Sequence, residues 1–87
     1  MTEKVTRIEV EIFGEYYTLK GVSSPEEMMA LALYVNRKMI QLATRNTKLS
    51  KSQTAVLAAL NIADELMKLQ EEHDNLVKML EPESKDK

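Results

Sequence analysis

The feature that most constrains the fold of this chain is an unbroken helical pattern covering its last third. Ser50 followed by Gln53 forms a capping box, which predicts that a helix begins there, and Pro82 predicts its end near Glu81. A helix of about 31 residues is roughly 46 Å long. The whole chain has only 87 residues, so one small domain cannot cover that length. We therefore expect part of the helix to leave the domain and to contact another chain.

The apolar residues of this helix change in pattern along its length. In the first half they cover most of the circumference, with Asn61 among them, which is typical of a helix buried on several sides. In the second half they narrow to one seam, with the spacing of four and three residues found in coiled coils. The seam consists of Ile62, Leu66, Leu69, His73, Leu76 and Leu80. The pattern predicts a globular head from which a coiled-coil stem extends.

The N-terminal residues predict a β-hairpin. Residues 7–13 alternate strictly between polar and apolar, as in a half-buried strand. Gly14 followed by Glu15 suits a two-residue type II′ turn, because glycine comes first. The register that this turn imposes gathers the apolar residues on one face. It pairs Phe13 with Tyr16, Ile12 with Tyr17, Val10 with Leu19 and Glu9 with Lys20.

Another helix follows the hairpin. Ser24, Pro25 and Glu27 form a capping box with proline at the first helical position. One apolar stripe then continues to about Thr44, through Met28, Ala32, Val35, Met39 and Leu42. The predicted fold class is therefore α+β: a β-hairpin followed by two helices (β-β-α-α), the second long and continuing as a coiled-coil stem. We expect a dimeric head in residues 1–66, a stem in residues 67–81 continuous with the head helix 51–81, and a disordered tail in residues 82–87.

Charge is distributed unevenly along the chain. The net charge is −2, and acids outnumber bases before residue 28 and after residue 63. Between these positions there is no acid and there are five bases: Arg37, Lys38, Arg45, Lys48 and Lys51. Most such runs are ordinary solvated surface, but a purely basic segment in an acidic chain also suits an acidic partner. The sequence leaves both interpretations open.

Catalytic and metal-binding chemistry has little support. The chain has no cysteine and a single histidine, His73, which falls on the predicted seam and is expected to pack there or at its flank. A general base would need a partner group converging on it in a cleft. We expect no enzyme activity, no cofactor and no metal. With no apolar run near the roughly 18 residues needed to span a bilayer, and no signal peptide, we expect a soluble cytoplasmic protein without a membrane partner.

Two stretches carry a resemblance to a known family: EVEIFGEYYTL, residues 9–19, and AVLAALNIADEL, residues 55–66. Together with the element order, they resemble the ZapA family of small bacterial proteins associated with the FtsZ division ring. The resemblance implies a dimeric head, a stem that pairs dimers into tetramers, and cross-linking of FtsZ filaments at mid-cell. FtsZ is then the acidic polymer to which the five bases would bind. The head junction at Asn61 and the seam from Ile62 to Leu80 would form the oligomer interface.

Alternatives stay open at two points. The amide of Asn61 either bonds across the junction between two chains, which would fix their register, or bonds a backbone carbonyl of its own chain. For the function, the rival is a small dimeric nucleic-acid-binding protein that uses the basic 37–51 surface. Negative net charge and the lack of a base-stacking or helix-turn-helix signature count against nucleic acid as a partner. A coiled-coil adaptor without a dedicated polymer partner is the third possibility.

Overall fold

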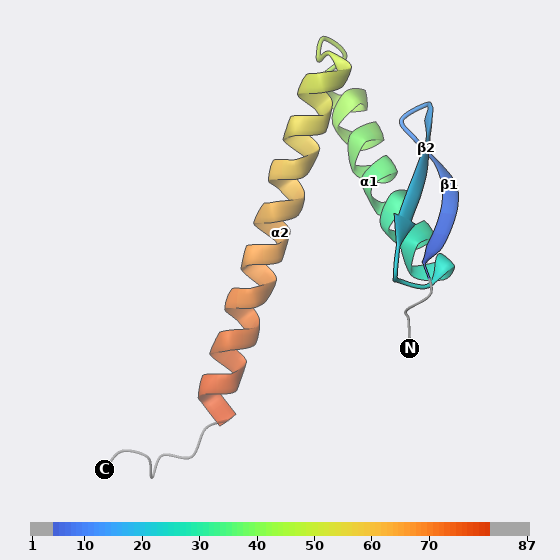
Figure 1. Cartoon of the computed structure of the whole chain (residues 1–87). Helices are drawn as coiled ribbons and strands as arrows, with labels where there is room; N and C mark the ends of the chain where they lie inside the picture. The colour runs from blue at the N-terminus through green and yellow to red at the C-terminus, as the bar shows by residue number, and fades with distance from the viewer. Residues whose placement is uncertain (1–4, 81–87) are drawn as a thin grey trace.

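Two strands and two helices follow one another in the predicted order (Figure 1). The computed structural model describes residues 5–80. It contains strands β1 (Thr6–Ile12) and β2 (Glu15–Gly21), then helices α1 (Pro25–Arg45) and α2 (Lys51–Leu80). This confirms the α+β class and the β-β-α-α order with a long second helix. The expected helix end at Glu81 and the disordered tail, residues 82–87, lie outside the described residues.

Both capping boxes form as predicted. At the start of α1 the Ser24 backbone N–H donates to Glu27 Oε1 at 3.2 Å, and the Glu27 N–H donates to Ser24 Oγ at 3.1 Å. At the start of α2 the Ser50 N–H donates to Gln53 Oε1 at 3.0 Å, and the Gln53 N–H donates to Ser50 Oγ at 3.1 Å. Each box satisfies backbone donors that have no partner inside the helix.

The hairpin turn and register differ from the prediction. The two turn residues are Phe13 and Gly14, and the last pair is Ile12 opposite Glu15. Phe13 has φ 52° and Gly14 has φ 84°, which is the pair of positive values that a type I′ turn requires. The expected type II′ turn at Gly14-Glu15 is therefore wrong. Positive φ is uncommon for phenylalanine; here its backbone N–H donates to Asn36 Oδ1 of α1 at 2.7 Å.

The correction shifts the register by two residues. Val10 lies opposite Tyr17 instead of Leu19, and Glu9 lies opposite Thr18 instead of Lys20. Because side chains alternate with a period of two, a shift of two leaves every residue on its predicted face. The apolar face of the hairpin is therefore preserved, whereas the expected Glu9–Lys20 charge pair is not formed.

The core lies between β1, α1 and the first half of α2. The predicted stripe of α1 faces into it: Met28, Ala32 and Met39 are buried, and Val35 and Leu42 are half-buried. The hairpin contributes Val10, and α2 contributes Thr54 and Ala58. Thr54 is fully buried with its hydroxyl donating to the Ser50 carbonyl at 2.9 Å, so no unpaired polar atom enters the core here.

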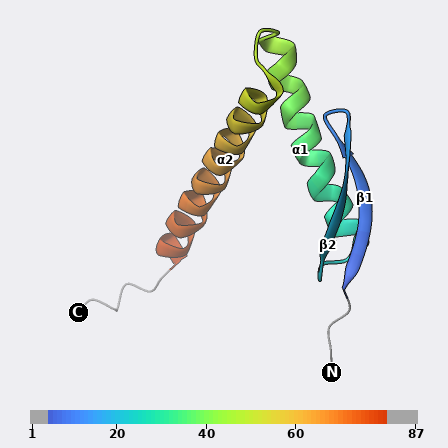
Figure 2. The same cartoon turned by 45° about the horizontal axis from the view of Figure 1, so that its top comes forward.

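The molecule is open and elongated. The hairpin lies along one side of α1, while α2 contacts α1 near the interhelical loop and then diverges from it (Figures 1 and 2). The radius of gyration is 18.4 Å, against about 12 Å for a compact domain of this length. The 30 residues of α2 make a rod of about 45 Å. Within the chain, α1 covers one side of the first half of α2, whereas the residues of α2 from Leu66 onward are exposed.

Candidate self-association and partner-binding surfaces

The first half of α2 has an uncovered apolar face opposite α1. Thr54 and Ala58 face α1 and are buried. Val56 follows Thr54 by two residues, which is about 200° around a helix. Val56, Leu60 and Met67 are each more than half exposed, and with Ala63 they repeat at intervals of four, three and four residues. This set is called the head face below. Exposed apolar faces are common at sites where proteins contact one another.

The second half of α2 has the predicted seam on another side of the helix. From Leu66 onward its residues are all exposed. Leu69 follows Leu60 by nine residues, which places the two about 180° apart around the axis. The head face and the seam therefore point in roughly opposite directions, and one neighbouring helix cannot cover both. His73 lies exposed in the seam, with Nδ1 3.7 Å from Asp74 Oδ1.

Asn61 lies on neither of these apolar faces. It begins a polar strip that continues through Asp64, Glu65 and Lys68. Its side-chain Nδ2 donates to the Leu57 carbonyl of the same helix at 3.1 Å. The local bond of the two alternatives is thus present in the single chain. A bond across two chains would use the remaining donor and acceptor of this exposed amide, and it stays a prediction.

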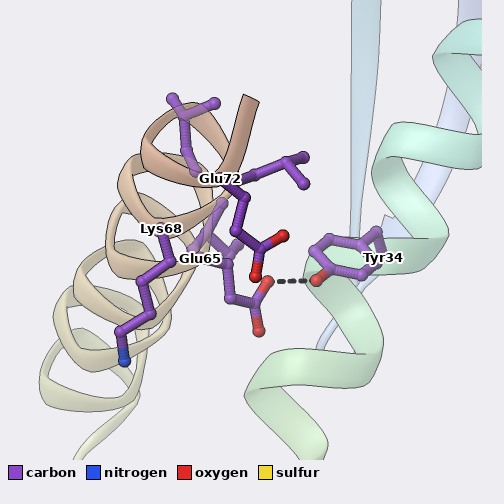
Figure 3. Close-up of a pocket in the computed structure, with 7 residues that line it drawn as sticks. Tyr34, Glu65, Lys68 and Glu72 are labelled. Atoms are coloured by element: carbon purple, nitrogen blue, oxygen red, sulfur yellow. Dashed lines mark hydrogen bonds between the residues drawn. The ribbon is translucent and has the colours of Figure 1, made fainter. Parts of the chain in front are cut away.

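The five predicted basic residues do not form one uniform surface. Lys38 forms an ion pair with Glu65 of α2. The other oxygen of Glu65 accepts the hydroxyl of Tyr34, one turn before Lys38 on α1 (Figure 3). The Lys38 ammonium also lies 5.4 Å from the centre of the Tyr34 ring. This group is called the helix clamp, because it joins α1 to α2.

The ionisation of the helix clamp is shifted toward the charged pair. The hydrogen bond from Lys38, and next that from Tyr34, holds the pKa of the Glu65 carboxyl below its usual value. The hydrogen bond to Glu65 raises the pKa of Lys38 and that of the Tyr34 hydroxyl. Glu65 is therefore ionised at neutral pH and acts as a fixed counter-ion to Lys38.

A second group repeats this arrangement at the hairpin tip. Lys51 Nζ lies 2.5 Å from Glu15 Oε2, and the Tyr17 hydroxyl donates to Glu15 Oε1 at 3.0 Å. Lys51 also lies 5.9 Å from the centre of the Phe13 ring. The hydrogen bond from Lys51 is the main cause of the lowered pKa of Glu15. This group, called the tip clamp, joins the hairpin to the start of α2.

Arg37, Arg45 and Lys48 are the remaining members of the basic set. All three side chains are exposed, and none of them has an ion-pair partner among residues 5–80. The structure thus brings distant acids to two of the five bases and leaves three facing solvent. The sequence did not predict that Glu15 and Glu65 pair with these lysines, because they lie 36 and 27 residues from them and no local spacing indicates such a pair.

A groove lies between α1 and α2 beside the helix clamp and extends toward the C-terminal half of α2. Tyr34 stands on one side, and Ile62, Leu66 and Leu69 supply apolar surface on the other. Figure 3 shows Glu72 directed into the same space as Glu65, whereas Lys68 points away from Tyr34.

Within residues 5–80, no group of His, Asp or Glu side chains is placed to hold a metal ion. Over the same residues, neither helix is both long enough and apolar enough to cross a membrane.

An elongated fold with uncovered apolar helix faces and a partly compensated basic surface is typical of small proteins that associate with other chains. The family model described as cell division protein ZapA matches residues 8–87. The chain belongs to this family, which is one of cell-division proteins and not of enzymes.

Individual relatives agree with the family match. The chain is 42% identical to cell division protein ZapA of Geobacillus thermodenitrificans (strain NG80-2), over 93% of this chain and 89% of that protein. It is 40% identical to ZapA of Bacillus thuringiensis (strain Al Hakam), over 84% and 82% of the two chains. Among solved structures it is similar to a ZapA mutant dimer from Geobacillus stearothermophilus, with a TM-score of 0.72 and 38% identity over 92% and 94% of the chains. The dimeric state of that relative supports self-association of this fold.

Proposed function

We propose that this chain is a non-enzymatic cell-division protein that binds FtsZ polymer and cross-links or bundles its filaments as a dimer or tetramer, promoting assembly of the Z-ring. The protein would then act in the cytoplasm at the mid-cell division ring. The observation that carries the proposal is the pair of uncovered apolar surfaces on opposite sides of α2. A chain with two such surfaces can hold two neighbours, which is the requirement for a cross-linker.

The two surfaces have different roles in this proposal. The head face lies beside the folded core, so we assign it to the dimeric head, residues 1–66, with Met67 just beyond the boundary to the stem. The narrow seam has coiled-coil spacing; it starts at Ile62 and Leu66 in the head, and we assign its continuation from Leu69 to Leu80 to the stem, residues 67–81, where it pairs dimers. The two assignments are separable, since a substitution in the stem leaves the head core untouched.

The partner surface in this proposal is the basic set, which lies on α1, in the interhelical loop and at the first residue of α2. Arg37, Arg45 and Lys48 present uncompensated charge, whereas Lys38 and Lys51 are paired with acids of the same chain. A dimer carries two copies of the surface, so two filaments can be held at once. Avidity then makes individually weak contacts effective.

Co-sedimentation tests the proposal. Purified protein is pelleted with FtsZ polymer, and a gel shift with random duplex DNA is run beside it. Pelleting and bundling with FtsZ, and no shift of DNA, is the expected result. A DNA shift without FtsZ pelleting favours the nucleic-acid-binding alternative. If the protein binds neither FtsZ nor DNA, the coiled-coil adaptor is the remaining alternative. Sedimentation equilibrium should show at least a dimer, and a folded monomer at micromolar concentration would contradict the assembly proposal.

A further inference from the structure

The two clamps have a consequence for the basic surface that they border. In each of them, one carboxylate oxygen contacts a lysine and the other accepts a tyrosine hydroxyl. The carboxylate is held from two sides, and its charge lies against a lysine of the basic set. Two of the five bases are therefore neutralised by acids of the same chain before any partner arrives.

We propose that Glu15 and Glu65 are internal counter-ions that mask Lys51 and Lys38 from an acidic partner, and so limit how strongly the basic surface binds. This inference rests on the proposed function only in taking the basic set as the partner surface. Masking means that an acidic ligand must displace a carboxylate to reach either lysine, while it reaches Arg37, Arg45 and Lys48 directly.

Exposure of the clamps makes such displacement feasible. The side chains of Lys51 and Glu15 are 46% and 53% exposed, and those of Lys38 and Glu65 are 21% and 42% exposed. Water and salt screen pairs of this kind, so they are weak and exchange with competing ions. The tip clamp is the more exposed of the two and should be the easier to displace.

The competing interpretation is purely structural, in which the clamps only hold the hairpin and the two helices together. The two interpretations predict opposite results for removal of the acid. Unmasking strengthens the binding of an acidic ligand. Loosening of the fold leaves the binding unchanged or weakens it, and it lowers stability or alters the oligomeric state.

The test uses Glu15→Gln and Glu65→Gln in the full chain, because glutamine keeps the shape and the oxygen that accepts the tyrosine hydroxyl. Glu9→Gln in β1 and Glu71→Gln in α2 are matched controls, since they change the net charge equally at acids that have no ion-pair partner among residues 5–80. The probe is labelled poly-L-glutamate at low salt. We expect each clamp variant to bind about two- to fivefold more tightly than the parent, the range expected of an exposed ion pair.

A double-substitution cycle separates unmasking from a general charge effect. In the parent, Lys38→Gln should weaken poly-L-glutamate binding less than Arg37→Gln does. In the Glu65→Gln background, Lys38→Gln should weaken it as much as Arg37→Gln does. Masking is overturned if the clamp variants bind no more tightly than the controls, or if Lys38→Gln has the same effect in both backgrounds.

The same proteins are then pelleted with FtsZ polymer, with circular dichroism and sedimentation as checks on folding and assembly. If the clamp variants bind poly-L-glutamate more tightly and no protein pellets with FtsZ, the result supports masking and contradicts the proposed function. If the parent pellets with FtsZ but the clamp variants bind neither ligand more tightly than the parent, the result contradicts masking and still supports the proposed function.

Discussion

At the scale of single residues, the hairpin turn shows a side chain of one element holding the backbone of another. Phe13 adopts φ 52°, a conformation that a bulky residue rarely takes. Asn36 Oδ1, from the middle of α1, accepts the Phe13 N–H at 2.7 Å. This bond satisfies a turn donor that points into the molecule, and it sets where the hairpin tip lies on α1.

Replacing Asn36 tests this bond. Asn36→Ala removes the acceptor and leaves the half-buried Phe13 N–H without a partner, so we expect a loss of about 1–3 kcal/mol in the free energy of unfolding. Gln41→Ala, an exposed position on the same helix, should change it by less than about 0.5 kcal/mol. Urea denaturation measures both. Equal effects for the two variants would show that the bond contributes nothing to the turn.

Asn61 gives a second prediction at this scale. Asn61→Leu should keep α2 intact, because the Leu57 carbonyl retains its helical bond to the backbone N–H at position 61. The substitution places apolar surface in the polar strip between the head face and the seam. We expect unchanged or higher thermal stability and a mixture of oligomeric states, measured by calorimetry and sedimentation velocity. Lower stability with a single oligomeric state would show that the local bond is the amide's only role.

At the scale of elements, α2 combines two contact surfaces in one continuous helix. The head face is next to the core and the seam is beyond it, so substitutions in the two surfaces should have separable effects on assembly. Both surfaces are exposed in the single chain, so we expect substitutions in them to leave the protomer folded.

A matched pair of substitutions tests the division. Leu60→Glu should disrupt the head dimer, whereas Leu76→Glu should weaken only the stem contact and leave a folded dimer. The expected loss in association free energy is about 2–4 kcal/mol for each leucine that the partner buries. Sedimentation equilibrium of the two variants is the measurement. If Leu76→Glu unfolds the whole chain, head and stem are not separate.

The helix clamp should make the free energy of unfolding depend on pH, because it joins α1 to α2. Because the folded pKa of Glu65 is lowered, its contribution to stability is fully present above the ordinary carboxyl value of 4.5. That contribution is lost as the pH falls below this value toward the folded pKa. The free energy of unfolding should therefore decrease more in the parent than in Glu65→Gln as the pH is lowered from about 5 to about 3. Parallel pH profiles from urea denaturation would mean that the clamp does not stabilise the helix pair.

At the scale of the whole molecule, the charge pattern follows from how the elements meet. Acids of β2 and α2 reach the basic segment at Lys51 and Lys38, and Arg37, Arg45 and Lys48 remain as the uncompensated charge. The uncompensated charge of these three residues is what would attract an acidic filament at long range.

Charge reversal of this set tests the proposed partner surface. The combined variant Arg37→Glu/Arg45→Glu/Lys48→Glu should remain folded, because surface substitutions usually change stability by less than about 0.5 kcal/mol each. Binding to FtsZ should fall sharply, and bundling should fall further, since it needs two copies of the surface. Light scattering and pelleting over a salt series measure both, and binding by the parent should weaken as salt rises. A folded variant that bundles like the parent at every salt concentration would show that this surface is only solvated.

The order of the elements, the starts of both helices and the buried stripe of α1 were predictable from the sequence alone. They depend on interactions between residues a few positions apart, as in the Ser24–Glu27 and Ser50–Gln53 boxes. The family resemblance likewise rested on short local stretches, residues 9–19 and 55–66.

Only the tertiary structure decided the hairpin turn and the partners of the basic residues. The acceptor for the Phe13 N–H comes from 23 residues away, so the glycine pattern alone favoured the wrong turn. The predicted basic segment contained no acid, yet two of its lysines acquired counter-ions from other elements. Neither outcome is encoded in a spacing, because both depend on how close the packing of α1, α2 and the hairpin brings residues that are distant in the chain.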